Sequence, residues 1–261
     1  MDLPEIHITV FGTGTSQGIP VIGCTCEVCT SHDERDRRLR SSVMISFGET
    51  RILIDVGPDF RQQMLRHGFR RLDAILLTHE HNDHISGLDD VRPLNFRQKS
   101  DIPVFGLPRV LAAVKRRFDY VFDPAYEYPG LPRLEMCALA PGQIEIAGVP
   151  IQVISVMHGP LEILGFRIGK FCYITDAKTI PADQMPLLQG LDTLIINALH
   201  RKAHFSHLNL TEALKMAEQI GADHTYFTHL SHDMGRHGDV EADLPPTVRL
   251  AYDGLSISVA H

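Results

Sequence analysis

The residue types best suited to chemistry stand together in one short segment of the first third of the chain. It begins at His79, reads His-Glu-His-Asn-Asp-His, and follows the apolar run 73–78, which predicts a buried strand. Because side chains two residues apart point to the same side of an extended backbone, His79, His81 and Asp83 can converge where the strand ends. His84 then opens a predicted helix. Imidazoles and carboxylates at this spacing suit two adjacent cations such as Zn²⁺, Mn²⁺ or Fe²⁺.

Three later apolar runs, each predicted to be a strand, also end in a residue that can bind a metal. These residues are His158, Asp176 and His229. A side chain at such a position emerges from the core onto the rim of a sheet. A single histidine there is more often an ordinary surface or core histidine, but three candidate ligands in succession favour a metal site. We therefore predict that they complete the site begun by residues 79–84.

The placement of the cysteines indicates a second kind of metal site. Of the five cysteines, Cys24, Cys26 and Cys29 lie within six residues, whereas Cys137 and Cys172 stand alone in apolar stretches. An odd number of cysteines argues against disulfides, and so does the reducing cytosol, which is the compartment expected for this chain. Three thiols flanked by glycine and threonine also make a poor core segment. We therefore predict that the three thiolates bind zinc.

A tetrahedral zinc site needs one more ligand. His232, three residues after His229, is the candidate for this fourth position. The glycine-rich stretch 12–18, just before the cysteines, could be taken for a dinucleotide-binding loop. Because Pro20 and the cysteines follow it where such a loop requires a helix, a dinucleotide site is not predicted.

The elements that must position these side chains alternate between short apolar runs and helical patterns. The predicted strands are 6–11, 42–47, 51–56, 73–78, 102–105, 143–147, 151–156, 163–168, 171–175, 193–198, 225–228 and 255–259. The predicted helices are 60–67, 84–96, 109–122 and 210–220, the last capped by Asn209 and ended by Gly221. Pro93 should kink or end the second helix, and 123–133 is the likeliest long surface loop. Two face-to-face sheets with helices outside them fit this order, in one α/β domain over residues 1–261.

Composition narrows the classes of function. The chain has 261 residues and a formal net charge of −7, without any basic block, so a nucleic-acid partner is not expected. The residues Met1–Ile6 lack the basic start and apolar run of a signal peptide. No apolar run reaches 18 residues, so no membrane span is expected and the predicted compartment is the cytoplasm.

The histidine motif, followed in order by a histidine, an aspartate and a histidine at strand ends, resembles the metallo-β-lactamase superfamily over almost the whole chain. This resemblance implies a four-layered αβ/βα sandwich with two catalytic metals. One metal would be held by His79, His81 and His158, and the other by Asp83, His84 and His229, with Asp176 bridging them. Asp55, after an early strand, matches the superfamily's acidic residue that supports the histidine loop.

The cysteine cluster, in a loop at about 18–40, and the later His232 resemble the PhnP subfamily of cyclic phosphodiesterases, whose members carry a structural zinc beside the catalytic metals. The resemblance implies hydrolysis of a small cyclic phosphodiester by a metal-bridged hydroxide, with Asp83 in the centre and His207 as general acid. His200 and His204 are rivals for the acid role. It also implies a homodimer. The catalytic metals are expected to be Mn²⁺ or Zn²⁺, with Fe²⁺ as an alternative.

Other activities suit the same ligands. A thioester, lactam or lactone hydrolase would not need His207. A tRNA-maturation ribonuclease is disfavoured by the acidic balance and by the lack of a Gly/Pro/Lys-rich arm that could hold tRNA. A redox di-iron protein or a PqqB-like cofactor-biosynthesis protein would keep the fold without hydrolysis. A binding module with zinc in a structural role only would leave the second ligand set unexplained.

Overall fold

The strands form two seven-stranded mixed sheets, which a computed structural model describes over residues 5–126 and 128–260. The first sheet, in the order β14-β1-β2-β3-β4-β5-β6, contains β1 (Ile6–Gly12), β2 (Ser42–Phe47), β3 (Thr50–Ile54), β4 (Ala74–Leu76), β5 (Ile102–Gly106), β6 (Leu134–Ala138) and β14 (Ser256–Val259). The second sheet, in the order β13-β12-β11-β10-β9-β8-β7, contains β7 (Gly142–Ile146), β8 (Val149–His158), β9 (Leu161–Ile168), β10 (Phe171–Ile174), β11 (Thr193–Asn197), β12 (His224–Thr228) and β13 (Val248–Leu250).

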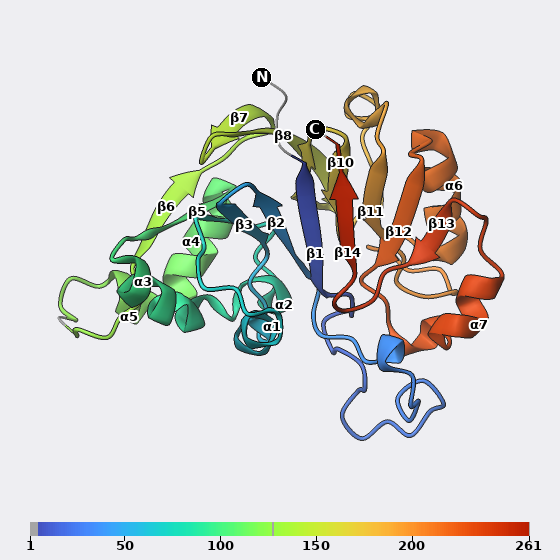
Figure 1. The fold of residues 1–261 in the computed structure, drawn as a ribbon, viewed down its shortest axis with the longest axis horizontal. Coiled ribbons are helices and arrows are strands. Elements are labelled where there is room, and N and C mark those ends of the chain that lie inside the picture. The colour runs from blue at the N-terminus through green and yellow to red at the C-terminus, as the bar shows by residue number, and fades with distance from the viewer. Residues whose placement is uncertain (1–4, 127, 261) are drawn as a thin grey trace.

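Helices cover the outer faces of both sheets (Figure 1). The helices are α1 (Phe60–His67), α2 (Asn82–Ile85), α3 (Arg92–Gln98), α4 (Pro108–Arg117), α5 (Asp119–Phe122), α6 (Leu210–Ile220) and α7 (His237–Ala242). Figure 1 shows α1 to α5 on the side of the first sheet and α6 and α7 on the side of the second. The predicted αβ/βα sandwich is therefore confirmed.

Burial explains why the layers stay together. One apolar cluster joins the inner faces of the two sheets, where Ile8 and Tyr173 are fully buried, and extends to helix α4 at Val110. A second apolar cluster lies between the second sheet and α6, with Ile196 and Ala213 fully buried. Burial of apolar surface contributes about 25 cal/mol per Å², so these two layers hold the strand ends in fixed positions.

Helix α6 follows from its sequence. Asn209 accepts a hydrogen bond from the backbone N–H of Glu212, whose carboxylate accepts the N–H of Asn209 in return, which completes a capping box. Gly221 ends the helix in a left-handed conformation with φ of 68°. The predicted bounds are confirmed.

Two predicted helices are wrong in their extent. Residues 84–96 are instead the one-turn helix α2, a 3₁₀ turn at Leu88–Val91, and α3, which has Pro93 in its first turn. Proline is tolerated there because the first N–H groups of a helix have no partner within it, so a helix begins near Pro93 rather than ending there. The predicted helix 109–122 is broken at Phe118, which has non-helical backbone angles between α4 and α5.

Two strands escaped prediction. β13 has only three residues, too few to show an alternating pattern. β6 is an edge strand whose residues are half-buried or exposed, so it lacks a clear apolar face. The surface loop is confirmed at residues 123–126 and 128–133, which contain no helix or strand.

The prediction that Met1–Ile6 contains no signal peptide falls mainly on positions outside the described residues. Within the described ranges, no helix combines the length and the apolar character that a membrane span requires.

The topology brings the polar strand ends together. β3, β4 and β5 run parallel to one another in the first sheet, and so do β10, β11 and β12 in the second. Because the carboxyl ends of parallel strands meet at one edge of a sheet, residues just beyond β4, β10 and β12 share one edge of the sandwich. The long loop between β1 and β2 extends below this edge in Figure 1.

Candidate metal centres

The predicted catalytic ligands gather at this edge in two neighbouring groups. The possible ligand atoms within each group lie within 4.8 Å of one another. One group is His79, His81 and His158, and the other is Asp83, His84 and His229. Asp176 lies within the same distance of His79 and His84. All seven predicted ligands are therefore brought together, in the sets that the family resemblance implies.

Asp176 stands between the two groups. Its Oδ1 lies 3.2 Å from Nδ1 of His229 and 3.6 Å from Nε2 of His84. Its Oδ2 lies 3.9 Å from Nε2 of His79. The Thr175 hydroxyl donates a 2.6 Å hydrogen bond to Oδ1 and fixes the carboxylate. Because its two oxygens face different groups, this side chain can bridge two cations.

Backbone strain is concentrated at the same place. Asp55, Asp176 and His229 have φ of 62°, 58° and 57°, in the left-handed region that non-glycine residues rarely occupy. Each stands one or two residues beyond a strand, and its left-handed turn directs the side chain into the site. Such conformations cost about 1–3 kcal/mol each and cluster at functional sites. The strain therefore supports a functional role for this edge.

The outward nitrogens of two histidines are held by hydrogen bonds. Nδ1 of His84 donates to the Asp55 carboxylate at 2.7 Å, and Asp55 also accepts from the N–H and hydroxyl of Thr78. Nδ1 of His158 donates to the carbonyls of Asp176 and Ser206 at 2.7 and 2.9 Å. In both rings, therefore, Nε2 is left to face the cluster, as in metal-binding histidines.

The glycine-rich segment 12–18 serves the site in a way that the sequence did not indicate. Its Thr15 hydroxyl lies 3.2 Å from Nε2 of His229, and the Ser41 hydroxyl lies 3.2 Å from Nδ1 of the same ring. Isolated Thr and Ser residues carry no sequence signal for such a role. Both residues orient His229 beside Asp176.

The chemistry of the pocket fits bound cations. The fully buried Nε2 of His84 has no hydrogen-bond partner among the described residues, although the Asp83 carboxylate is only 3.2 Å away. A buried nitrogen without a hydrogen-bond partner is rare in folded proteins, and a bound ion would explain it. Burial lowers the pKa of His79 well below its usual value and that of His229 to about 4, so both rings present neutral lone pairs.

The carboxylates impose the opposite shift on His84. Burial alone would lower its pKa, but Asp83, Asp176 and Asp55 together raise it well above the usual value. A proton on His84 thus offsets part of the negative charge of the pocket. A divalent cation would offset this charge more completely, since it binds the carboxylates directly.

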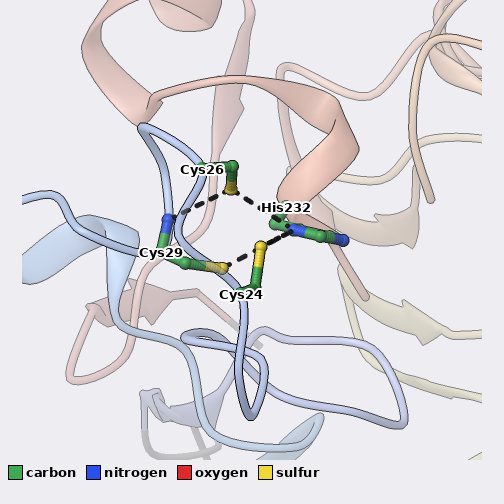
Figure 2. A group of neighbouring side chains, drawn as sticks. All are labelled: Cys24, Cys26, Cys29 and His232. Carbon is green, nitrogen blue, oxygen red and sulfur yellow. Dashed lines mark hydrogen bonds between the residues drawn. The ribbon is translucent and has the colours of Figure 1, made fainter.

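The cysteine cluster has the shape of a zinc site (Figure 2). Nδ1 of His232 lies 3.3, 3.4 and 3.5 Å from the sulfurs of Cys24, Cys26 and Cys29. A tetrahedron with Zn–S of about 2.3 Å and Zn–N of about 2.0 Å has N···S edges of about 3.5 Å. The three cysteines come from the β1–β2 loop, whereas His232 comes from the segment after β12. The residues present therefore fit zinc.

The thiols of this cluster differ in acidity. The backbone N–H of Cys29 lowers the pKa of the Cys26 thiol to about 6. Burial raises the pKa of the Cys29 thiol to about 11. A bound cation would hold all of these thiols as thiolates.

His207 lies against the catalytic ligands. Its Nε2 is 3.2 Å from Oδ2 of Asp176, and its side chain is 12% exposed. Its ring stacks on His229, with centroids 5.1 Å apart. Of the two rivals, His204 contacts the opposite nitrogen of His207, and His200 lies beyond His204. The structure therefore places His207 nearest the bridging carboxylate.

The helix predicted at 84–96 cannot supply a substantial dipole to the site. That helix is not continuous, and α2 has four residues. A helix of one turn has too few aligned peptide groups to produce a substantial dipole.

Arg109 of α4 ties together two segments that carry ligands. Its guanidinium donates to the Glu80 carboxylate, between His79 and His81, and to the Glu162 carbonyl on β9. β9 forms a hairpin with β8, which ends in His158. Because the partners lie 29 and 53 residues from Arg109, no local pattern could have indicated this role.

Arg109→Met is expected to weaken metal binding at the group His79, His81 and His158 by about 10-fold, a usual cost for losing a residue that supports ligands. Competition with a chromophoric chelator would measure the affinities. Arg116→Met is the matched control, because Arg116 lies exposed on the same helix. Equal affinities in the two variants would contradict the role of Arg109.

Comparisons with known proteins agree with this fold. A model of the beta-lactamase superfamily domain matches residues 50–230. The crystal structure described as a new diphosphatase from the PhnP family is 42% identical and superposes with a TM-score of 0.93 over 98% of both chains. An octanoyltransferase of Porphyromonas gingivalis is 41% identical over 94% of this chain and 50% of its own length. A ribonuclease Z of Bradyrhizobium is 34% identical over 59% of this chain and 47% of its own. The chain thus spans about half the length of these curated relatives.

Proposed function

Because this chain belongs to the metallo-β-lactamase superfamily, whose fold is that of metal-dependent hydrolases, we propose that it is a PhnP-like phosphodiesterase. The proposed substrate is a small phosphodiester, cyclic ones included. The similarity to a PhnP-family diphosphatase supports a phosphorus centre as the point of attack.

The proposed site holds two divalent cations, Mn²⁺, Zn²⁺ or Fe²⁺, in the two ligand groups that share Asp176. When bound, such a pair lowers the pKa of a water toward neutrality and offsets charge on a phosphate. The cluster of Cys24, Cys26, Cys29 and His232 holds a structural Zn²⁺ in this proposal. Its three cysteines stand in the β1–β2 loop and its histidine follows β12, apart from the reacting groups.

One observation carries the choice of a phosphodiester: a sixth imidazole, outside both ligand groups, lies against the shared carboxylate. Nε2 of His207 is 3.2 Å from Asp176. During hydrolysis the water gives up one proton to the solvent as its oxygen bonds to phosphorus. The P–O bond to the leaving group breaks, and the leaving oxygen takes the Nε2 proton of His207, which the ring regains from the solvent. An alkoxide needs this proton because it is a strong base, whereas a thiolate leaves readily without it.

The test is the dependence of His207→Ala on the leaving group. Hydrolysis of 2′,3′-cyclic AMP, which releases an alkoxide, is expected to fall by about 10²–10⁴-fold, the usual contribution of a general acid. Hydrolysis of bis(p-nitrophenyl) phosphate, which releases a stabilised phenolate, should fall much less. Elemental analysis should show an unchanged metal content. If the rate of 2′,3′-cyclic AMP hydrolysis falls no more than that of bis(p-nitrophenyl) phosphate hydrolysis, the acid role of His207 is wrong.

A second candidate is hydrolysis of an acyl thioester. The octanoyltransferase relative supports it, because its name concerns an acyl group, although that protein is twice as long as the matched region. An octanoyl thioester belongs in the same assay. If the wild-type protein cleaves it faster than either phosphodiester, and His207→Ala spares that reaction, the thioester replaces the phosphodiester as the proposed substrate.

The partners stay predictions. The net charge of −7 favours a small substrate over tRNA, despite the partial similarity to ribonuclease Z. The homodimer and the cytoplasmic location also stay predictions.

A further inference from the structure

His204 contacts the nitrogen of His207 that points away from the metal ligands. The two Nδ1 atoms are 3.2 Å apart. Ser206 lies beside both: its hydroxyl is 3.1 Å from Nδ1 of His207 and 3.4 Å from Nδ1 of His204. The backbone N–H of Ser206 also donates to Nδ1 of His204, at 3.3 Å. The His204 ring and the Ser206 hydroxyl therefore converge on one side of the His207 ring.

These contacts determine which nitrogens carry protons. A backbone N–H can only donate, so Nδ1 of His204 must present its lone pair to Ser206. Nδ1 of His204 can also accept a hydrogen bond directly from Nδ1 of His207. Alternatively, the Ser206 hydroxyl accepts from Nδ1 of His207 and donates to Nδ1 of His204. Both arrangements place a proton on Nδ1 of His207, since without it two lone pairs would face each other across the 3.2 Å between the Nδ1 atoms. On its other side the His207 ring donates from Nε2 to the Asp176 carboxylate, 3.2 Å away, because a carboxylate can only accept.

The surroundings of His204 keep it an acceptor. Burial lowers its pKa, and the neighbouring His207, His200 and Lys178 lower it further, so the ring is neutral at neutral pH. The loop that carries it is fixed at its base by backbone hydrogen bonds from Leu199 to the Leu208 carbonyl and from Leu210 to the His200 carbonyl. The acceptor is thus held in place by the backbone.

We propose that His204 is a positioning residue, which holds the Nδ1 proton of His207 and so directs the Nε2 proton at the leaving group. This inference rests on the proposed function and deepens it. As the Nε2 proton passes to the leaving oxygen, the Nδ1–H stays hydrogen bonded, so the neutral product ring needs no change of tautomer. The role matches that of the group that orients the histidine in a catalytic triad, with a neutral imidazole in place of a carboxylate.

Two substitutions of nearly equal shape separate the acceptor role of His204 from the volume of its side chain. His204→Leu removes it, whereas Oδ1 of the side chain in His204→Asn can accept near the position of Nδ1. For His204→Leu we expect kcat on 2′,3′-cyclic AMP to fall about 10–100-fold, with KM within about threefold and bis(p-nitrophenyl) phosphate hydrolysis nearly unchanged. His204→Asn should recover most of the activity. His200→Leu is the control, since Nδ1 of His200 donates to the Lys202 carbonyl instead. Equal losses on both substrates, or no recovery in His204→Asn, would overturn the proposal.

A second readout does not depend on activity. In zinc-loaded protein with ¹⁵N-labelled histidine, NMR should show the neutral His207 ring protonated on Nδ1 in the wild type and in His204→Asn, and as a tautomer mixture in His204→Leu. A wild-type ring protonated on Nε2 alone would overturn the role of His204. If the tautomers behave as expected but neither phosphodiester is cleaved, the proposed function fails while the positioning by His204 holds.

Discussion

Asp176→Asn is expected to reduce kcat/KM by about 10³-fold, equivalent to the several kcal/mol that a metal pair contributes to a transition state, and to leave at most one ion at the catalytic site. The cause is the loss of one charge from a carboxylate whose two oxygens face the two ligand groups. Asparagine suits this test because it tolerates the left-handed backbone at this position. Elemental analysis and steady-state kinetics would measure the two effects.

The matched control is Asp223→Asn, an equal change at an exposed aspartate before β12. It should keep both catalytic ions and full activity. Two tightly bound catalytic ions in Asp176→Asn, together with unchanged activity, would refute the bridging role.

Cys26→Ser is expected to remove one zinc per chain and to lower the free energy of unfolding by about 4 kcal/mol where free zinc exceeds its dissociation constant about 1,000-fold. The reason is that three thiolates and His232 stabilise the folded chain only as a complete site. Thermal unfolding followed with and without added zinc would measure the loss. The wild type should lose the same increment when a chelator removes its zinc.

Cys137→Ser is the control for this change, because Cys137 is also half-buried and lies outside the cluster. It should keep the zinc content and the unfolding temperature of the wild type. A Cys26→Ser protein that retains the full zinc content would show that the cluster does not hold the ion.

The parts of the site that the sequence revealed are those encoded locally. His79 to His84 follow one strand within a few residues, and the Asn209 cap and Gly221 stop fix α6 through neighbouring groups. The later ligands could be predicted because each ends an apolar run. Fold and ligand positions thus follow from short-range patterns combined with the meeting of parallel strands at one edge.

The supporting residues were missed because they act over long range. Thr15 and Ser41 contact a histidine 214 and 188 residues away. Their residue types are common in loops, so only the folded chain distinguishes them. The break at Phe118 was missed because the packing of this buried residue, rather than helical periodicity, determines where α4 stops. The start of α3 was missed because Pro93 was interpreted as ending a helix, although proline is also tolerated in a first turn.

The short connection between His229 and His232 has a consequence for how the polypeptide acquires its metals. The two residues between them are anchored to distant segments, Leu230 to Thr13 and Ser231 to Leu199, by backbone hydrogen bonds. A zinc ion captured first by the cysteine loop would therefore set the last imidazole of the catalytic pair before any catalytic ion arrives. Binding of the catalytic ions then costs less conformational entropy. We therefore expect zinc to bind the cysteine cluster before ions bind the catalytic ligands.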